Sequence, residues 1–83
     1  MKESAVIRWL ELVPVRAGLP EAGRFHCSSD LYNRTHDLID SAMRANMSWV
    51  MTDCPHREKL GWLECAYLLE PSFLYRYDGR DWF

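Results

Sequence analysis

The sequence lacks the features that mark disulfide-rich, membrane-spanning and nucleic-acid-binding proteins. Its three cysteines are an odd number, which argues against a complete disulfide framework. No apolar run approaches the roughly 20 residues of a transmembrane helix, and the opening residues have no uninterrupted apolar core of the kind found in a signal peptide. The net charge of -2 leaves no basic field for nucleic acid or a membrane surface. These absences leave the compartment undecided between cytoplasm and periplasm.

The chain does have enough apolar residues to fold. Hydrophobic residues make up 48% of its 83 residues, a composition that excludes an intrinsically disordered chain. A chain of this length forms one small domain at most. It buries only about 60–65% of the surface that its unfolded form exposes, so its stability alone is expected to be marginal.

The N-terminal third of the chain contains no helical pattern. Residues 5–16 hold β-branched residues and a brief polar-apolar alternation, which predict a strand. Pro14 would confine that strand to the edge or the end of a sheet, because proline cannot donate to a ladder. Residues 17–29 carry two glycines and a proline, and they are predicted to be a connector.

A helix is predicted from about residue 30 to about residue 50. A pair of serines just before it can cap its start, and Asp30 lies favourably in the first turn. Polar residues recur at steps of three and one along one face, where Asp40 and Arg44 form an i,i+4 pair on the solvated side. The other face holds Leu31, Tyr32, Leu38, Ile39, Ala42, Met43, Met47, Trp49 and Val50, and the methionines and Trp49 among them are expected to pack in a core.

A second helix is predicted after a turn. Since the residue before a proline is pushed out of the α region, Pro55 stops the first helix near Thr52. The second helix would begin between residues 58 and 61, and Pro71 would end or kink it. Residues 72–77 can add another helical turn or two.

The loop between these helices is crowded with reactive side chains, in the stretch MTDCPHREKLGWLEC. One interpretation is a zinc site. Zinc sites favour closely paired ligands such as C-x2-C with a second pair at a set spacing, and neither feature is present. No metal and no cofactor is therefore expected, and each cysteine is predicted to be a small buried hydrophobe. The candidate ligands considered were Cys54, His56 and Cys65, with His26 and Cys27 as further possibilities.

An acid-base site fits this loop better. Asp53 and Glu58 are carboxyl groups five residues apart, Arg57 stands beside Glu58, and Trp62 follows within a turn. Carboxylates accept from sugar hydroxyls, a guanidinium donates in a fixed fork, and an indole covers the apolar face of a sugar ring. The alternative is a capping loop, in which the acids hold backbone N–H groups and have no chemical task.

The segment TDCPHREKLGW resembles the signature of the α-L-rhamnosidases of glycoside hydrolase family 78. The longer stretch GRFHCSSDLYNRTHDLIDSAMRANMSWVMTDCPHREKLGWLE resembles the start of their helical catalytic domain, and VPVRAGLPEAG resembles the strand and linker that lead into it from a β-sandwich. This resemblance implies a mainly α fold of two or three helices from the start of an (α/α)6 six-hairpin barrel. Residues 1–25 would be the strand and linker, and residues 26–83 the first helices of the domain.

The resemblance also implies roles for individual residues. Glu58 matches the general acid, Asp53 an acid that binds rhamnose hydroxyls, Arg57 an arginine of the sugar subsite, and Trp62 a tryptophan that lines the pocket. Many relatives carry RDERLGW where this chain has the shorter REKLGW. Glu58 can therefore align with either acid of the longer pattern, and Glu64 is kept as the fallback proton donor.

Members of that family remove terminal α-L-rhamnose with inversion, so a rhamnose-containing oligosaccharide or glycoside is the implied substrate. The family's catalytic base comes from much later in the domain, which implies that the isolated 83-residue chain is inactive. Cys65 stands where relatives commonly carry a polar residue. The alternative function is a truncated, non-catalytic module that binds sugar or associates with a second copy of itself, and a homo-oligomer is expected if the fragment stands alone.

Overall fold

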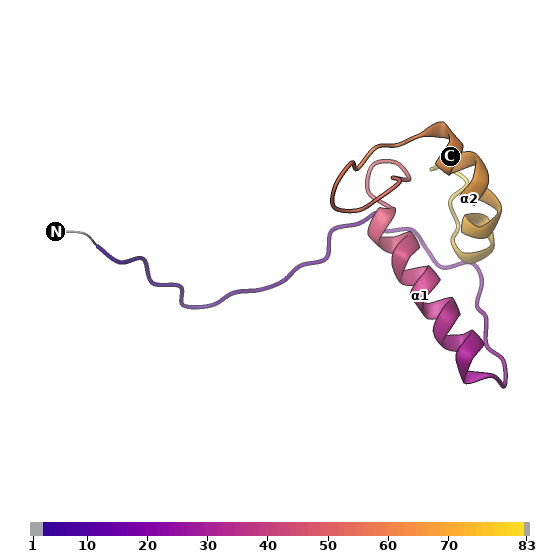
Figure 1. The fold of residues 1–83 in the computed structure, drawn as a ribbon, viewed down its shortest axis with the longest axis horizontal. Helices are drawn as coiled ribbons and strands as arrows, with labels where there is room; N and C mark the ends of the chain where they lie inside the picture. Colours follow the sequence, from indigo (N-terminus) through magenta and orange to yellow (C-terminus); the bar gives the residue numbers. More distant parts are fainter. Residues whose placement is uncertain (1–2, 83) are drawn as a thin grey trace.

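The computed structural model describes residues 3–82 and consists of two helices, a long loop between them and an N-terminal tail (Figure 1). Helix α1 spans Asp30–Asn46 and helix α2 spans Leu63–Arg76. The described residues form no sheet, only two isolated bridges, Glu21 with Tyr77 and Met47 with Met51. The prediction of a mainly α fold is therefore confirmed. Neither helix is long and apolar enough to cross a membrane within the described part of the chain.

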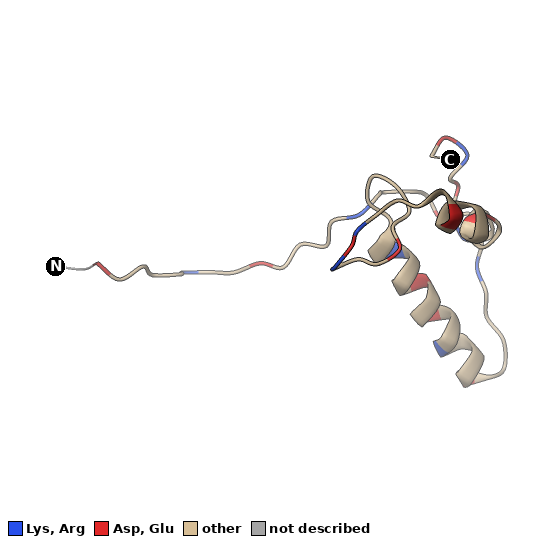
Figure 2. Cartoon of the chain, turned by 45° about the horizontal axis from the view of Figure 1, so that its top comes forward, with Lys and Arg blue, Asp and Glu red and all other residues tan. Residues whose placement is uncertain are grey.

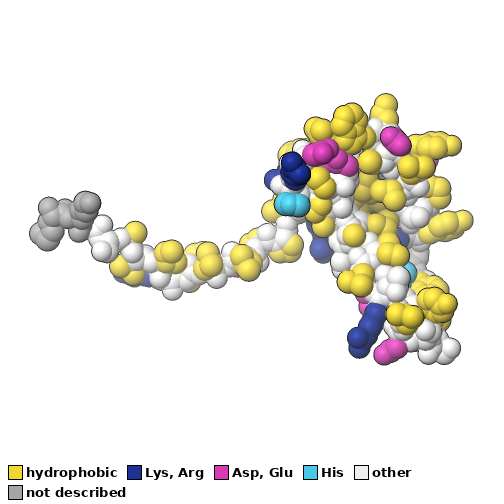
Figure 3. Space-filling view, viewed as in Figure 1, with side chains coloured by type: hydrophobic (Ala, Val, Ile, Leu, Met, Phe, Trp, Pro, Cys, Tyr) yellow, Lys and Arg dark blue, Asp and Glu magenta, His cyan; other side chains and the backbone are white. Residues whose placement is uncertain are grey.

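The strand predicted at residues 5–16 is not formed. Residues 3–16 run away from the helices without helix or strand (Figure 1), and their large apolar side chains face solvent (Figure 3). A strand needs partner strands to satisfy its backbone and cover its side chains, and residues 3–82 supply none. Met1 and Lys2 belong to the predicted strand and linker of residues 1–25, and Phe83 belongs to the predicted helical segment of residues 26–83. These three residues lie outside the described part of the chain. The exposed apolar side chains of the tail are Val6, Ile7, Trp9, Leu10, Leu12, Val13 and Val15.

Helix α1 begins at the predicted residue but is capped differently. Ser29 is the N-cap residue, yet its hydroxyl makes no capping hydrogen bond. The side-chain amide of Asn33 instead pairs with the backbone of Cys27, accepting from its N–H (2.9 Å) and donating to its carbonyl oxygen (2.8 Å). This pairing fixes how the connector enters the first turn of α1.

Helix α1 ends earlier than predicted, at Asn46. The chain reverses directly afterwards, because the N–H of Thr52 donates to the carbonyl oxygen of Asn46 (3.1 Å) and Met47 pairs with Met51. Trp49 lies at the tip of this reversal and is 94% exposed. The prediction that Trp49 packs in a core is therefore wrong for this chain, since the helical period on which it rested stops three residues before it.

Helix α2 starts later than predicted and continues through its proline. Lys59 has a left-handed backbone, with φ 56°, and a right-handed helix cannot contain such a residue. The helix therefore begins only at Leu63, after the turn is complete. Pro71 lies inside α2 and does not end it, and the helical turn predicted over residues 72–77 is the last part of α2, which reaches Arg76.

A small core joins the ends of the two helices. Phe73, fully buried, stacks on Trp82 with ring centroids 5.0 Å apart and lies 5.6 Å from the ring of Tyr77. Met43 of α1 and Met47, which directly follows α1, complete this contact, which confirms the prediction that these methionines pack inside. The buried set is Met43, Met47, Met51, Phe73 and Tyr77, with Ala17, Leu19 and Trp82 packed around it.

Beside this core lies a cluster of ion pairs that includes Asp40 and Arg44, the pair predicted on the solvated side of the first helix. The Asp40–Arg44 pair forms as predicted (2.9 Å), but the end of α2 covers it. Arg76 donates to Asp40 from Nε (2.9 Å) and to Glu21 from a terminal nitrogen (2.9 Å), and Arg44 also reaches Glu21 (2.7 Å). The Tyr77 hydroxyl donates to Asp40. These contacts tie the connector to both helices.

The ionisation of Asp40 gives this cluster a pH dependence. Burial disfavours its charged form, but hydrogen bonds from Tyr77 and Arg76 outweigh burial and hold the pKa of Asp40 below its usual range. A carboxyl with a lowered folded-state pKa stabilises the fold fully above its unfolded pKa, about 3.9, and loses that contribution as pH falls through the folded value. We expect the free energy of urea unfolding to fall between pH 6 and pH 2. Asp40→Asn should show a smaller fall over that range, and an equal fall would contradict this assignment.

Candidate functional site

The loop that carries the predicted site residues is closed by Asp53. Its Oδ1 accepts from the N–H of Cys54 (2.8 Å) and from the N–H of Leu60 (3.1 Å), and its own N–H donates to the carbonyl oxygen of Leu60 (3.0 Å). The residue thus does what the capping-loop alternative predicts. Figure 2 shows acidic and basic residues placed side by side along this loop between α1 and α2.

Pro55 and Gly61 each determine the local conformation of the loop. Pro55 opens the turn that covers residues 55–58, and the left-handed backbone of Lys59 follows it. Gly61 then passes so close to Val50 that a Cβ on Gly61 would collide with the Val50 side chain. The loop is therefore held both by Asp53 and by its contact with the reversal after α1.

Within this loop the carboxyls of Asp53 and Glu58 meet. A hydrogen bond from Glu58, together with N–H donors at Leu60 and Cys54 and the side chain of Trp62, holds the pKa of Asp53 below its usual range. The same hydrogen bond and the negative charge of Asp53 raise the pKa of Glu58. As the pH falls, Glu58 therefore takes up a proton before Asp53 does.

The structure brings together three of the five predicted site residues. Asp53 interacts with Glu58 and with the half-exposed Trp62, and both interactions lower its pKa. Arg57 lies in the exposed turn beside them and makes no ion pair with any of residues 3–82. Glu64, the fallback acid, lies in the first turn of α2, outside the Asp53–Glu58 contact.

The cysteines behave differently from the prediction that each is simply a small buried hydrophobe. Cys27, Cys54 and Cys65 are free and only half-buried. The sulfur of Cys54 accepts a hydrogen bond from the backbone N–H of Glu58 (3.1 Å). Sequence reasoning missed this contact, although the four-residue spacing across a proline turn was a signal that could have suggested it. Among residues 3–82 no group of three or more His, Cys, Asp or Glu side chains is placed to hold a metal ion.

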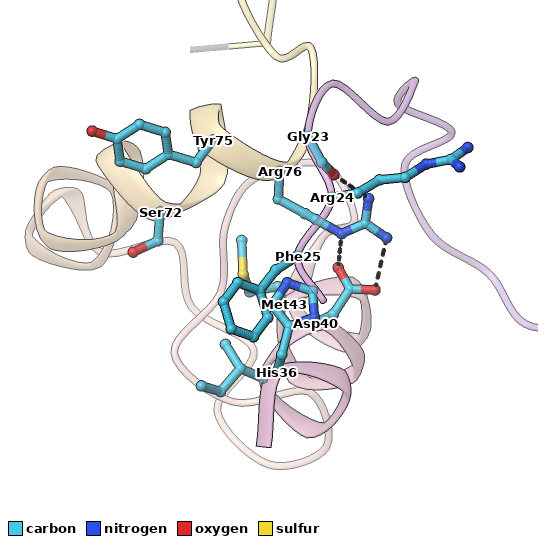
Figure 4. Close-up of a pocket in the computed structure, with 10 residues that line it drawn as sticks. Gly23, Arg24, Phe25, His36, Asp40, Met43, Ser72, Tyr75 and Arg76 are labelled. Carbon is cyan, nitrogen blue, oxygen red and sulfur yellow. Dashed lines mark hydrogen bonds and ion pairs between the residues drawn. The ribbon is translucent and has the colours of Figure 1, made fainter. Parts of the chain in front are cut away.

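A cavity of about 360 Å³ lies away from this loop, between α1, α2 and the connector (Figure 4). Phe25 and His36 stack along one wall, with ring centroids 5.3 Å apart. On another wall, Arg76 donates hydrogen bonds to Asp40, to Glu21 and to the carbonyl oxygen of Gly23. The cavity's main charged groups are thus committed to holding the fold together.

A carboxyl with a raised pKa, a second carboxyl that interacts with it, an indole and a nearby guanidinium form a set of groups used by carbohydrate-cleaving enzymes. Residues 20–83 match the family described as the bacterial alpha-L-rhamnosidase 6 hairpin glycosidase domain, and the chain belongs to this family. That match places the two helices at the start of a six-hairpin glycosidase domain.

A curated relative supports the family assignment. The chain is 38% identical over 74 residues to an alpha-L-rhamnosidase of Formosa agariphila. Those residues are 89% of this chain but 8% of the relative, so the chain spans less than a tenth of that protein's length. No solved structure matches the chain.

Proposed function

We propose that this chain is the acid-bearing segment of an inverting glycoside hydrolase that removes terminal α-L-rhamnose from a rhamnose-containing glycoside. Glu58 is the general acid in this proposal and donates its proton to the glycosidic oxygen. Asp53, Arg57 and Trp62 contact the sugar. Residues 1–25 connect the domain to a preceding β-sandwich, and residues 26–83 open the six-hairpin barrel.

The observation that carries this proposal is the contact between the Asp53 and Glu58 carboxyls. A general acid must hold its proton at the working pH, which an ordinary glutamate does poorly. Asp53 raises the pKa of Glu58 by hydrogen bonding and by charge. The neighbouring Arg57 and Lys59 do not reverse this direction, since Asp53 dominates the environment of Glu58.

The same contact limits what else Asp53 can do. Two hydrogen-bonded carboxyl oxygens lie about 2.5–3.0 Å apart. The acid and base of an inverting glycosidase lie about 6.5–9.5 Å apart, because a water must fit between the base and the sugar. Asp53 is therefore too close to Glu58 to serve as its base. The base must come from a part of the enzyme beyond this loop, and we expect the isolated chain to have no turnover.

A chimera tests the proposal. The 74 matched residues of the Formosa agariphila alpha-L-rhamnosidase are replaced by those of this chain, and the product is incubated with an aryl α-L-rhamnoside. We expect release of rhamnose, with the β-anomer appearing first in a proton NMR time course. The isolated chain is the control and should release none. A folded chimera without turnover, or one that gives the α-anomer first, would contradict the proposal.

The alternative, a self-associating helical module, is favoured by one observation. Helix α2 exposes Leu63 (88%), Tyr67 (78%) and Leu68 (64%), so a continuous apolar stretch faces water when the chain is alone. We expect the mass of the isolated chain measured by light scattering to rise with concentration, and Leu63→Glu with Leu68→Glu to suppress that rise. A monomer at every concentration would rule this alternative out.

A further inference from the structure

Cys54 contacts both carboxyl residues of the candidate site. Its backbone N–H donates to Oδ1 of Asp53 (2.8 Å), and its sulfur accepts from the backbone N–H of Glu58 (3.1 Å). Pro55 follows it and keeps its backbone out of the α region. The sulfur of Cys54 lies over the turn that ends at Glu58.

The hydrogen bond to sulfur spans the turn formed by residues 55–58. Glu58 is exposed, and its carboxyl interacts with Asp53. Its backbone N–H is held by the sulfur of Cys54. If this bond is lost, the turn is free to open, and the exposed carboxyl of Glu58 exchanges its contact with Asp53 for water.

We propose that Cys54 is a positioning residue, whose sulfur holds the backbone of Glu58 so that the two carboxyls stay in contact. The catalytic importance of Glu58 rests on the proposed function, whereas the hydrogen bond between Cys54 and Glu58 does not depend on it. Cys54 touches no reacting atom in this scheme. It acts through Glu58, and it gives a chemical reason for a cysteine in the loop that does not require a metal or a disulfide.

A purely packing role for Cys54 makes the opposite prediction for two substitutions. If the half-buried side chain only filled space, Cys54→Ala would be the milder change and Cys54→Ser would add an unfavourable polar group. If the sulfur acts as an acceptor, serine keeps an acceptor at nearly the same place and alanine removes it. The rank order of the two variants therefore separates the two roles.

Carboxyl carbon-13 NMR titration of the 83-residue chain tests this inference without any turnover. In the unmodified chain the pKa of Glu58 should lie above that of a free glutamate, about 4.3. In Cys54→Ala it should fall toward that value, and in Cys54→Ser it should stay raised. Asp78, whose pKa is lowered by a hydrogen bond from Arg80 in the C-terminal turn, is the internal reference and should not change in either variant.

Two results would overturn the inference. One is a pKa of Glu58 that is the same in Cys54→Ala as in the unmodified chain. The other is a Cys54→Ser variant that loses the raised pKa as completely as Cys54→Ala does. Neither result depends on whether Glu58 is the general acid, so failure of the positioning role remains distinct from failure of the proposed activity.

Discussion

Replacing Glu58 by glutamine in the chimera is expected to lower kcat/KM on an alkyl α-L-rhamnoside by about 10²–10⁴-fold, the usual contribution of a general acid. Glutamine preserves the size of the side chain and can still reach Asp53, but it has no proton to give to the departing oxygen. The loss should shrink on a substrate whose leaving group needs no protonation, such as a dinitrophenyl rhamnoside. Initial rates on the two substrates measure this difference.

Glu64→Gln is the matched control for that experiment. Glu64 lies two residues after the motif, in the first turn of α2, and is not among the groups that shift the pKa of Asp53. We expect its activity to stay within a few-fold of the chimera's on both substrates. If Glu64→Gln produces the large loss that depends on the leaving group, and Glu58→Gln does not, the fallback assignment is correct and Glu64 is the acid.

Phe73→Ala is expected to destabilise the chain by about 3–5 kcal/mol, the usual cost of removing a buried phenylalanine. The ring is fully buried and packs on Trp82 and Tyr77, so its removal takes contacts from both. Since small proteins are stable by only about 0.05–0.15 kcal/mol per residue, this loss is comparable to the total stability of the chain. Urea unfolding followed by tryptophan fluorescence measures it.

Tyr75→Ala is the control for that substitution. Tyr75 lies two residues along the same helix, and its side chain is 82% exposed. The change removes a similar ring and leaves helix propensity nearly the same as in Phe73→Ala. We expect a loss of less than about 1 kcal/mol, as is usual for a surface position. Similar losses for the two variants would show that the core described around Phe73 does not hold the chain together.

The helices were predictable where local signals govern them. The apolar period of the predicted first helix correctly placed Met43 and Met47 inside, because both pack with Phe73 and Tyr77 in the buried core. The same period failed at Trp49, where the hydrogen bond between Thr52 and Asn46 turns the chain back. That bond joins residues six apart and leaves no periodic trace in the sequence.

The site was predictable as a set of residues but not as a geometry. The motif placed Asp53 and Glu58 in one loop, and the structure brings their carboxyls together. The motif did not show that the backbone of Lys59 is left-handed, nor that the sulfur of Cys54 accepts from Glu58. Both features depend on how the loop closes on Asp53, which is a property of the folded chain.

The hydrogen bond from the N–H of Ala17 to the carbonyl oxygen of Met47 (2.7 Å) joins the end of the tail to the reversal that leads into the site loop. Because Ala17 precedes Glu21 in the chain, a force applied to the tail acts on Met47 before it acts on the ion pairs of Glu21. Tension applied to the tail is therefore transmitted to the segment that carries Asp53 and Glu58, through this hydrogen bond and through the packing of Ala17 on the core.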